Sequence, residues 1–344
     1  MKKKLVAGLV GISILATMLI GCGGKEEVPP EETGEVVEQS DEVFELKLGH
    51  IMPAEHPNGL ASEEFARLVE EETDGRVKVS VFHASSLGTA QEVVDSIAIG
   101  AVDFTIDGFG EPAKQYLPFQ LLDAPYLAKD REHFMRILNS EAVATMYEEM
   151  RQKTGISVLG SVYYGARYIT TSDFEVNSPS DLEGKIIRVP DQSMYVSTLG
   201  AMGAVATPMA FSEVFMALSN GVVDGQENPL ATIYSNKFFE VQKYLVKTQH
   251  IMGGNIFLAS DKTLEKLPED LRQIVVECAA KASEFGTEKA YELEDQYLQE
   301  LVDEGMILIE NPDNDAFKES VKSIFENPDA AWTKEQYEAI KAVE

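Results

Sequence analysis

One helical pattern runs through the 37 residues from Pro268 to Glu304, and it limits the folds that this chain can adopt. Helices in globular proteins have about 11–12 residues on average. At about 1.5 Å per residue, a helix of this length reaches about 55 Å, which is longer than one ordinary domain is wide. We therefore expect this helix to cross more than one domain.

Shorter strand-like and helix-like segments alternate along the rest of the chain. The period of the apolar residues changes repeatedly between two, typical of strands, and 3.6, typical of helices. The expected elements are strand 44–49, helix 57–73, strand 77–81, helix 90–99, strand 101–106, helix 130–151, strand 156–160, strand 162–171, short capped helix 178–184, strand 185–189, helix 211–219, strand end 222–225 and strand 241–248. Such alternation predicts an α/β fold, in which helices cover both faces of a sheet.

The length of the chain, 344 residues, favours two domains. We expect domain I to comprise residues 44–164 and 253–290, and domain II to comprise residues 165–252 and 291–344. Several segments then cross between the domains. Two α/β domains joined by a hinge in this way form a clamp that closes on a ligand.

The first residues of the chain have the pattern of a secretory signal peptide. Three lysines precede an apolar run over residues 5–20, so we assign residues 1–21 to the signal. The run is shorter than the roughly 20 residues that a transmembrane helix requires. Cys22 follows Gly21 as in a bacterial lipobox, and we expect cleavage before Cys22 and lipidation of its thiol. An ordinary signal peptide with an incidental cysteine is the alternative.

A tether is expected between this cysteine and the folded part, over residues 22–43. Residues 23–42 contain seven Glu, one Asp and no aromatic residue, so they cannot bury a core. As a random coil, about 20 residues span about 25 Å. We expect an extracytoplasmic protein that a lipid holds at the cell membrane, on the periplasmic side if the cell has an outer membrane.

Charge and cysteine content exclude several classes of partner and structure. Acidic residues outnumber basic ones by 58 to 29, a net charge of −29, which argues against binding to nucleic acid or to anionic lipid surfaces. The chain has two cysteines, and Cys278 lies in an apolar helical stretch. With Cys22 lipidated, no disulfide forms, and we interpret Cys278 as a small core residue.

Sequence motifs of catalysis are missing from the chain. It contains no G-x-S-x-G, H-E-x-x-H, P-loop or G-x-G-x-x-G motif. The five histidines are scattered, and Asp313-Asn314-Asp315 lacks the glycine and the distal glutamate of a calcium loop. These observations favour a binding protein over an enzyme, with no cofactor and no metal.

Two arginines are the strongest candidates for a binding site. Between Arg151 and Arg272 the chain has only Arg167 and Arg188, and both lie in strand-like apolar stretches. The planar guanidinium group matches a carboxylate with two parallel hydrogen bonds. The alternative is that each arginine forms a structural ion pair with an aspartate or glutamate of this acidic chain.

Three segments carry a resemblance to a known family. They are residues 205–218 (Val-Ala-Thr-Pro-Met-Ala-Phe-Ser-Glu-Val-Phe-Met-Ala-Leu), residues 221–230 (Gly-Val-Val-Asp-Gly-Gln-Glu-Asn-Pro-Leu) and residues 239–245 (Phe-Glu-Val-Gln-Lys-Tyr-Leu). Together with Leu48-Gly49-His50, His56-Pro57 and Ser86-Leu87-Gly88, they resemble the solute-binding proteins of TRAP transporters, the DctP family. The resemblance covers about residues 44–325. It implies two α/β domains, a hinge and a long helix that spans both domains.

The resemblance also implies a ligand site and partners. Arg188 would form the central salt bridge to a ligand carboxylate, and Arg167 would be a second contact or an orienting residue. Asn228 would donate a hydrogen bond to the same carboxylate, and Phe211 would pack on the body of the ligand. The partners would be a small and a large integral membrane subunit driven by an ion gradient, with the binding protein a monomer.

The wall that selects the ligand is less defined by the sequence. Asp107, Gln91 and Phe109 are candidate wall residues, whereas Ala90 and Gly108 have no hydrogen-bonding side chain. Members of the family that bind sialic acid carry polar or acidic residues there, so we do not expect sialic acid. A four-carbon dicarboxylate, a sugar acid, a keto acid and an amino or aromatic acid remain open.

Two further functions are alternatives to transport. A secreted α/β hydrolase would need a nucleophile or a metal, and the sequence offers no constellation for either. A ligand-sensing lipoprotein that docks on a membrane receptor would share the same pocket.

Overall fold

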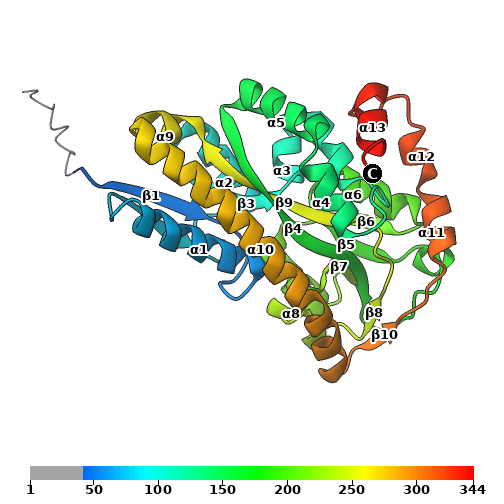
Figure 1. Ribbon diagram of the computed structural model, residues 1–344. Helices are drawn as coiled ribbons and strands as arrows, with labels where there is room; N and C mark the ends of the chain where they lie inside the picture. Colours follow the sequence, from blue (N-terminus) through cyan, green and yellow to red (C-terminus); the bar gives the residue numbers. More distant parts are fainter. Residues whose placement is uncertain (1–41) are drawn as a thin grey trace, which may run out of the picture. The chain divides into compact units, whose positions relative to one another are not determined.

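A computed structural model describes residues 42–344 of the chain (Figure 1). The signal peptide, the lipobox at Cys22 and nearly all of the tether over residues 22–43 lie outside the described residues. Within residues 42–344, no helix combines the length and the apolar character that crossing a membrane demands.

The elements alternate as the sequence predicts. The strands are β1 (Phe44–Gly49), β2 (Val77–Phe82), β3 (Phe104–Gly108), β4 (Ile156–Thr171), β5 (Ile186–Val189), β6 (Val205–Pro208), β7 (Gly225–Pro229), β8 (Tyr244–Val246), β9 (Met252–Ser260) and β10 (Ile307–Ile309). The α-helices are α1 (Pro57–Glu72), α2 (Ala90–Ile99), α3 (Gly110–Ala113), α4 (Arg131–Leu138), α5 (Glu141–Thr154), α6 (Ser193–Ala201), α7 (Val214–Ser219), α8 (Leu230–Ser235), α9 (Asp261–Lys266), α10 (Glu269–Asp303), α11 (Asn314–Ser320), α12 (Lys322–Phe325) and α13 (Lys334–Lys341). Short 3₁₀ helices are η1 (Leu117–Asp123), η2 (Pro179–Leu182), η3 (Phe211–Glu213) and η4 (Phe238–Glu240).

A ten-stranded mixed sheet runs through the described part of the chain. Its main path has the order β2-β1-β3-β9-β4-β7-β5-β6, and β8 pairs with both β4 and β10. The strand pairs β1–β2, β1–β3, β5–β6 and β5–β7 are parallel, whereas β9 is antiparallel to both β3 and β4. The α/β class is therefore confirmed.

Strand β4 connects the two halves of the sheet, of which the first contains β1, β2, β3 and β9 and the second contains β5, β6, β7, β8 and β10. Residues 156–166 pair with β9, residues 167–171 pair with β7, and residues 169–171 also pair with β8. The sequence predicted two strands here, over 156–160 and 162–171, but they are one. Irregular register around Gly160 and Gly165 breaks the alternation of side chains, which explains why the pattern looked interrupted.

The long helix α10 spans the sheet diagonally in Figure 1 and packs against α1, β4 and α8. Its 35 residues match the predicted length closely. Close approach to α1 depends on Gly286, because a Cβ atom there would lie 2.8 Å from the Cβ of Ala61. Cys278 is buried in this helix and is unpaired, as its apolar neighbours predict.

Each half of the sheet has its own apolar core. In the first half, Phe65, Phe104 and Phe257 pack edge to face with ring centroids 4.7–6.1 Å apart. In the second half, Phe238 and Leu245 belong to a separate buried cluster. Burial of this apolar surface is the main source of stability for such layers.

Several predicted elements are shorter than their patterns. The predicted helix 130–151 is two helices, because Ser140 caps α5 by accepting a hydrogen bond from the backbone N–H of Val143. The predicted helix 211–219 opens as the 3₁₀ turn η3. Of the strand predicted over 241–248, only Tyr244–Val246 pairs with neighbours.

Candidate functional site

A cavity of about 530 Å³ lies between the two halves of the sheet. Six of the seven side chains that the sequence predicts for the ligand site line this cavity; they are Arg188, Arg167, Asn228, Phe211, Asp107 and Gln91. They come from β3, α2, β4, β5, η3 and β7, so the fold brings together residues that are more than 100 positions apart. Loops at strand ends of open α/β sheets are the usual place for ligands.

Arg188 is a buried cation that has no carboxylate partner in the described part of the chain. Its side chain is 2% exposed, and its Nε and Nη2 donate to the carbonyl oxygen of Met209 at 3.1 and 2.7 Å. Nη1 is buried and has no hydrogen-bond partner, and no acidic side chain within residues 42–344 lies within 4.0 Å. Burial lowers the pKa of Arg188 to about 10, so the group is still charged at neutral pH.

Arg167 is paired within the protein. Its guanidinium group donates two hydrogen bonds to the buried carboxylate of Glu227, from Nε to Oε2 and from Nη2 to Oε1, the latter at 2.8 Å. Although burial disfavours both charged forms, the pair raises the pKa of Arg167 and lowers the pKa of Glu227. The ring of Tyr195 lies 4.8 Å from the guanidinium carbon. The structural ion pair considered as an alternative is therefore present at Arg167.

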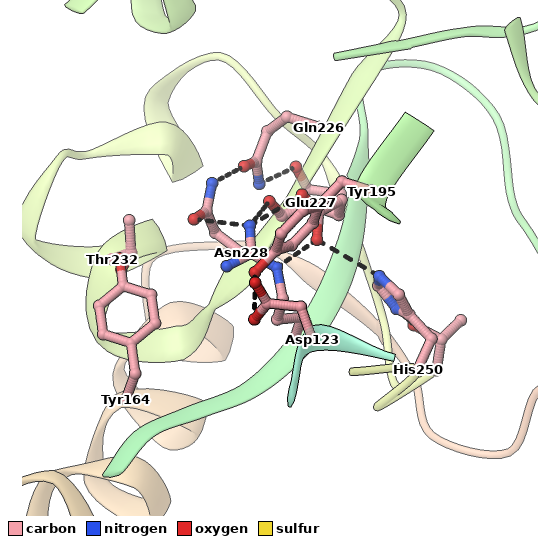
Figure 2. Close-up of polar contacts among 11 residues, drawn as sticks. Asp123, Tyr164, Tyr195, Gln226, Glu227, Asn228, Thr232 and His250 are labelled. Atoms are coloured by element: carbon pink, nitrogen blue, oxygen red, sulfur yellow. Dashed lines mark hydrogen bonds and ion pairs between the residues drawn. The ribbon is translucent and has the colours of Figure 1, made fainter. Parts of the chain in front are cut away.

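Asn228 is oriented by a chain of hydrogen bonds (Figure 2). Its Oδ1 accepts from Arg167 Nη2 at 3.1 Å, and its Nδ2 donates to Gln226 Oε1 at 2.5 Å. Gln226 Nε2 donates to the hydroxyl of Thr170, which donates to Gln242 Oε1, both at 2.9 Å. This chain uses one N–H of the Asn228 amide, and an amide nitrogen has two.

Glu227 has a second partner in His250. The His250 Nε2 atom lies 3.3 Å from Glu227 Oε2, and its Nδ1 lies 2.8 Å from the hydroxyl of Thr248. Burial lowers the pKa of His250, which keeps the ring neutral. Neither Glu227 nor His250 was predicted from the sequence, although Glu227 lies inside the family-like segment 221–230 next to Asn228.

Phe211 belongs both to the cavity wall and to the core. Its ring centroid lies 5.9 Å from the guanidinium carbon of Arg188 and 6.1 Å from the ring of Phe238. The side chain is half-buried and lines the cavity. One face of the ring is thus supported by apolar packing.

The wall formed by the first half of the sheet is polar. Asp107 accepts from the backbone N–H of Gly108 at 2.8 Å, and burial together with the nearby Glu111 raises the pKa of Asp107 to about 7. Asn58 and Asn255 are each 3% exposed, and Asn58 Oδ1 has no hydrogen-bond partner within residues 42–344. A buried amide oxygen without a partner, such as Asn58 Oδ1, is suited to accept from a ligand hydroxyl group.

Two of the predicted wall residues differ from expectation in their contacts. Phe109 does not line the cavity: it is fully buried, and its ring packs edge to face on Phe119 at 5.9 Å. The reason is that β3 ends at Gly108, and the chain turns Phe109 into the core before α3. Gln91 does line the cavity, but its Nε2 donates to Asp95 at 2.9 Å on the same helix.

The described residues hold no group of three or more His, Cys, Asp or Glu side chains that could bind a metal ion. The cavity chemistry is instead a buried positive charge at one wall and hydrogen-bonding side chains at the other. Such a site can hold an anion that also carries hydroxyl groups.

Known proteins resemble this chain in sequence and in fold. Residues 48–329 match the family model described as bacterial extracellular solute-binding protein, family 7 (DctP). A solute-binding protein of Roseobacter denitrificans is 38% identical over 241 residues, which is 70% of this chain and 73% of that protein. A structure of that protein with bound L-galactonate matches this chain with a TM-score of 0.82 at 32% identity. The match covers 88% of this chain and 99% of the chain in that structure.

Two further relatives differ in ligand. The sialic acid-binding periplasmic protein of Vibrio cholerae is 32% identical over 265 residues, 77% of this chain and 82% of that protein. A TRAP periplasmic solute-binding protein from a Polaromonas species, solved with D-erythronate, has a TM-score of 0.84 at 28% identity and covers 88% of this chain and 99% of that one.

Proposed function

Because the chain belongs to the DctP family of bacterial extracellular solute-binding proteins, we propose that it binds a sugar acid and delivers it to a TRAP transporter. The bound molecule would be a small carboxylate with several hydroxyl groups. The related proteins solved with L-galactonate and D-erythronate hold ligands of this kind.

The observation that carries this proposal is the unpaired charge of Arg188. A buried cation is costly unless an anion compensates it. Nη1 of Arg188 lacks a partner, and the carbonyl of Met209 fixes the rest of the guanidinium group. A ligand carboxylate beside Nη1 would supply the missing acceptor. The amide of Asn228, on the same cavity, would donate to that carboxylate through its second N–H.

Arg167 would act on the ligand mainly through its neighbours. Its charge is neutralised by Glu227, and its Nη2 holds the oxygen of Asn228. The amide nitrogen of Asn228 then faces away from Arg167, which suits a carboxylate acceptor. We therefore assign Arg167 an orienting role.

The polar wall favours a hydroxylated ligand over a dicarboxylate. Asp107 and Glu111 place two acidic groups on this side, with Lys114 Nζ 2.9 Å from Glu111 as a counter-charge. A second ligand carboxylate would meet like charge there, whereas ligand hydroxyl groups would find acceptors. A sugar acid is therefore our proposed ligand class, with the carboxylate at Arg188 and hydroxyl groups near Asn58 and Asp107.

Binding would involve closure of two domains, with domain I at residues 44–164 and 253–290 and domain II at residues 165–252 and 291–344. The cavity takes residues from both halves of the sheet, and β4 crosses between the halves near Gly165. Gly165 has φ 120°, a left-handed conformation that favours glycine, which is suited to a bend. Removal of water on closure would strengthen the contacts to the carboxylate.

The finer parts of the proposal concern the cell envelope. We propose that lipid on Cys22 anchors the protein outside the cytoplasm, that a small and a large membrane subunit receive the ligand, and that the protein acts as a monomer without catalysing a reaction. The relatives from Roseobacter denitrificans and Vibrio cholerae are binding proteins, which supports the role in binding without catalysis.

A ligand screen tests the proposal directly. The folded part would be titrated with L-galactonate, D-erythronate, D-glucuronate, succinate and sialic acid, by thermal melting and by calorimetry. We expect sugar acids to raise the melting temperature by mass action, by more than succinate does. If no acid of this panel binds at millimolar concentration, the proposed ligand class is wrong.

A further inference from the structure

The loop from His83 to Gly88 reaches the cavity and has a backbone conformation that is unfavourable for residues with side chains. It joins β2 to α2, and its residue Ser85 lines the cavity. Ala84 and Ser85 have φ angles of 51° and 59°, so two successive residues with side chains are left-handed. This conformation is unfavourable for residues with a side chain, so neighbouring groups must stabilise it.

Contacts with the end of β1 hold the loop in place. The backbone N–H of Ala84 donates to the carbonyl of Met52 at 2.9 Å, and the N–H of Ser85 donates to the carbonyl of His50 at 3.2 Å. Leu87 packs on Gly49, where a Cβ atom would lie 2.9 Å from Leu87 Cδ1. The loop is therefore fastened along the strand end that borders the cavity.

A relay of hydrogen-bonded side chains, from His50 through His83 to Glu63, also holds the loop. His50 Nδ1 accepts from the backbone N–H of Met52 at 3.2 Å, so the hydrogen of this neutral ring lies on Nε2. His50 Nε2 then donates to His83 Nδ1 at 2.9 Å, and His83 Nε2 donates to Glu63 Oε1 at 2.7 Å. Burial lowers the pKa of His50 to about 3, which keeps His50 neutral in this role.

Ser85 itself has an unused hydroxyl group. Its Oγ makes no hydrogen bond to any group among the described residues, although the side chain is half-buried at the cavity. The adjacent Ser86 differs: it is exposed and does not line the cavity. The relay thus holds one hydroxyl at the ligand site and leaves its neighbour in solvent.

We propose that Ser85 hydrogen-bonds a hydroxyl group of the bound sugar acid, and that His83 is the positioning residue that holds Ser85 there. This inference rests on the proposed function, because it assumes a hydroxylated ligand in the cavity. It names a contact that discriminates between sugar acids by the position and configuration of a hydroxyl group, apart from the carboxylate contact at Arg188.

Paired substitutions test both parts of the inference. Ser85→Ala should weaken binding of L-galactonate or D-erythronate, whichever binds the unmodified protein, by roughly 3- to 10-fold, the usual net effect of one hydrogen bond. Ser86→Ala is the matched control and should bind as the unmodified protein does. Equal affinities of Ser85→Ala and the unmodified protein for both acids would overturn the ligand contact.

Two conservative changes at His83 separate positioning from general stability. Asn places an oxygen near the position of Nδ1 and can still accept from His50, whereas Gln reaches toward Glu63 and leaves His50 without its acceptor. We expect His83→Asn to retain most affinity and His83→Gln to lose about as much as Ser85→Ala does. In the double variant with Ser85→Ala, His83→Gln should cause no further loss.

The outcomes of this cycle are distinct. Fully additive losses would refute the positioning role, because His83 would then act independently of Ser85. Melting curves without ligand report whether each variant is folded. If His83→Gln unfolds the loop, His83→Asn is compared with the unmodified protein instead. Failure of the unmodified protein to bind any sugar acid would refute the proposed function instead, since no variant is needed for that result.

Discussion

Replacement of Arg188 by alanine is predicted to abolish most ligand binding while the protein stays folded. Among residues 42–344 the guanidinium group has no carboxylate partner, and its hydrogen bonds there go to the carbonyl of Met209. Truncation leaves the ligand carboxylate buried and short of donors, which typically costs about 3–5 kcal/mol. This corresponds to a roughly 10²- to 10³-fold or larger loss of affinity.

Arg167→Ala provides the matched comparison. Removal of this arginine strands the fully buried Glu227 carboxylate, so we expect loss of about 3–5 kcal/mol of folding free energy even without ligand. Arg188→Ala removes no internal ion pair and should leave the ligand-free melting temperature nearly unchanged. Arg188→Lys should be intermediate in affinity, since it keeps the charge but loses the fork of donors.

Calorimetric titration with the sugar acid that binds most tightly measures the loss of affinity. Melting curves without ligand measure the loss of folding stability. Near-normal affinity in Arg188→Ala, with a lowered melting temperature, would show that Arg188 supports the fold and would refute its assignment to the ligand. Equal melting of Arg167→Ala and the unmodified protein would refute the structural role of the Arg167–Glu227 pair.

Three further predictions concern pH, closure and anchoring. Affinity for a sugar acid should fall as pH rises through about 7, because Asp107 becomes negative there, and Asp107→Asn should remove that dependence. Since the pKa of Asp107 is raised in the folded state, its contribution also makes the folded state less stable as pH rises from about 4 to about 7, and this loss remains at higher pH. A flat pH profile would contradict this. Small-angle scattering should show a smaller radius of gyration with saturating ligand, and an unchanged curve would argue against a clamp. Cys22→Ser should move the protein from the membrane to the soluble fraction, and retention at the membrane would place the anchor elsewhere.

Helix α10 and the α/β alternation could be predicted from the sequence because both depend on local periodicity. Arg188 and Asn228 could be placed in one site only through the family-like segments, since their strands β5 and β7 pair through hydrogen bonds that no local pattern encodes. The polar partners of the site were not predictable in the same way. The pairing of Arg167 with Glu227 depends on β4 and β7 being antiparallel neighbours, which brings residues 60 positions apart into contact.

Phe109 was predicted to line the ligand site, but its side chain lies in the core. Its position after a strand and beside Gly108 suggested a wall residue, but a single turn of backbone decides whether the ring faces the cavity or the core. The sequence around it, with Asp107 two residues before and Glu111 two residues after, contains no signal that decides this direction. Ser85 was missed for a related reason, because its left-handed backbone is imposed by contacts with β1 that lie outside its own segment.

The shared strand β4 has a consequence for how the chain reaches its fold. Residues 156–166 of β4 find their partner in β9, which is synthesised about 90 residues later, so the central pair of the first half cannot form until the second half has almost emerged. Contacts between segments so distant in sequence slow folding, because the intervening chain must be ordered or looped out first. A fragment that ends before residue 252 would leave residues 156–166 of β4 without their partner β9, and the exposed strand edge should cause aggregation. We therefore expect the first half of the sheet to stay incomplete until β9 has been synthesised.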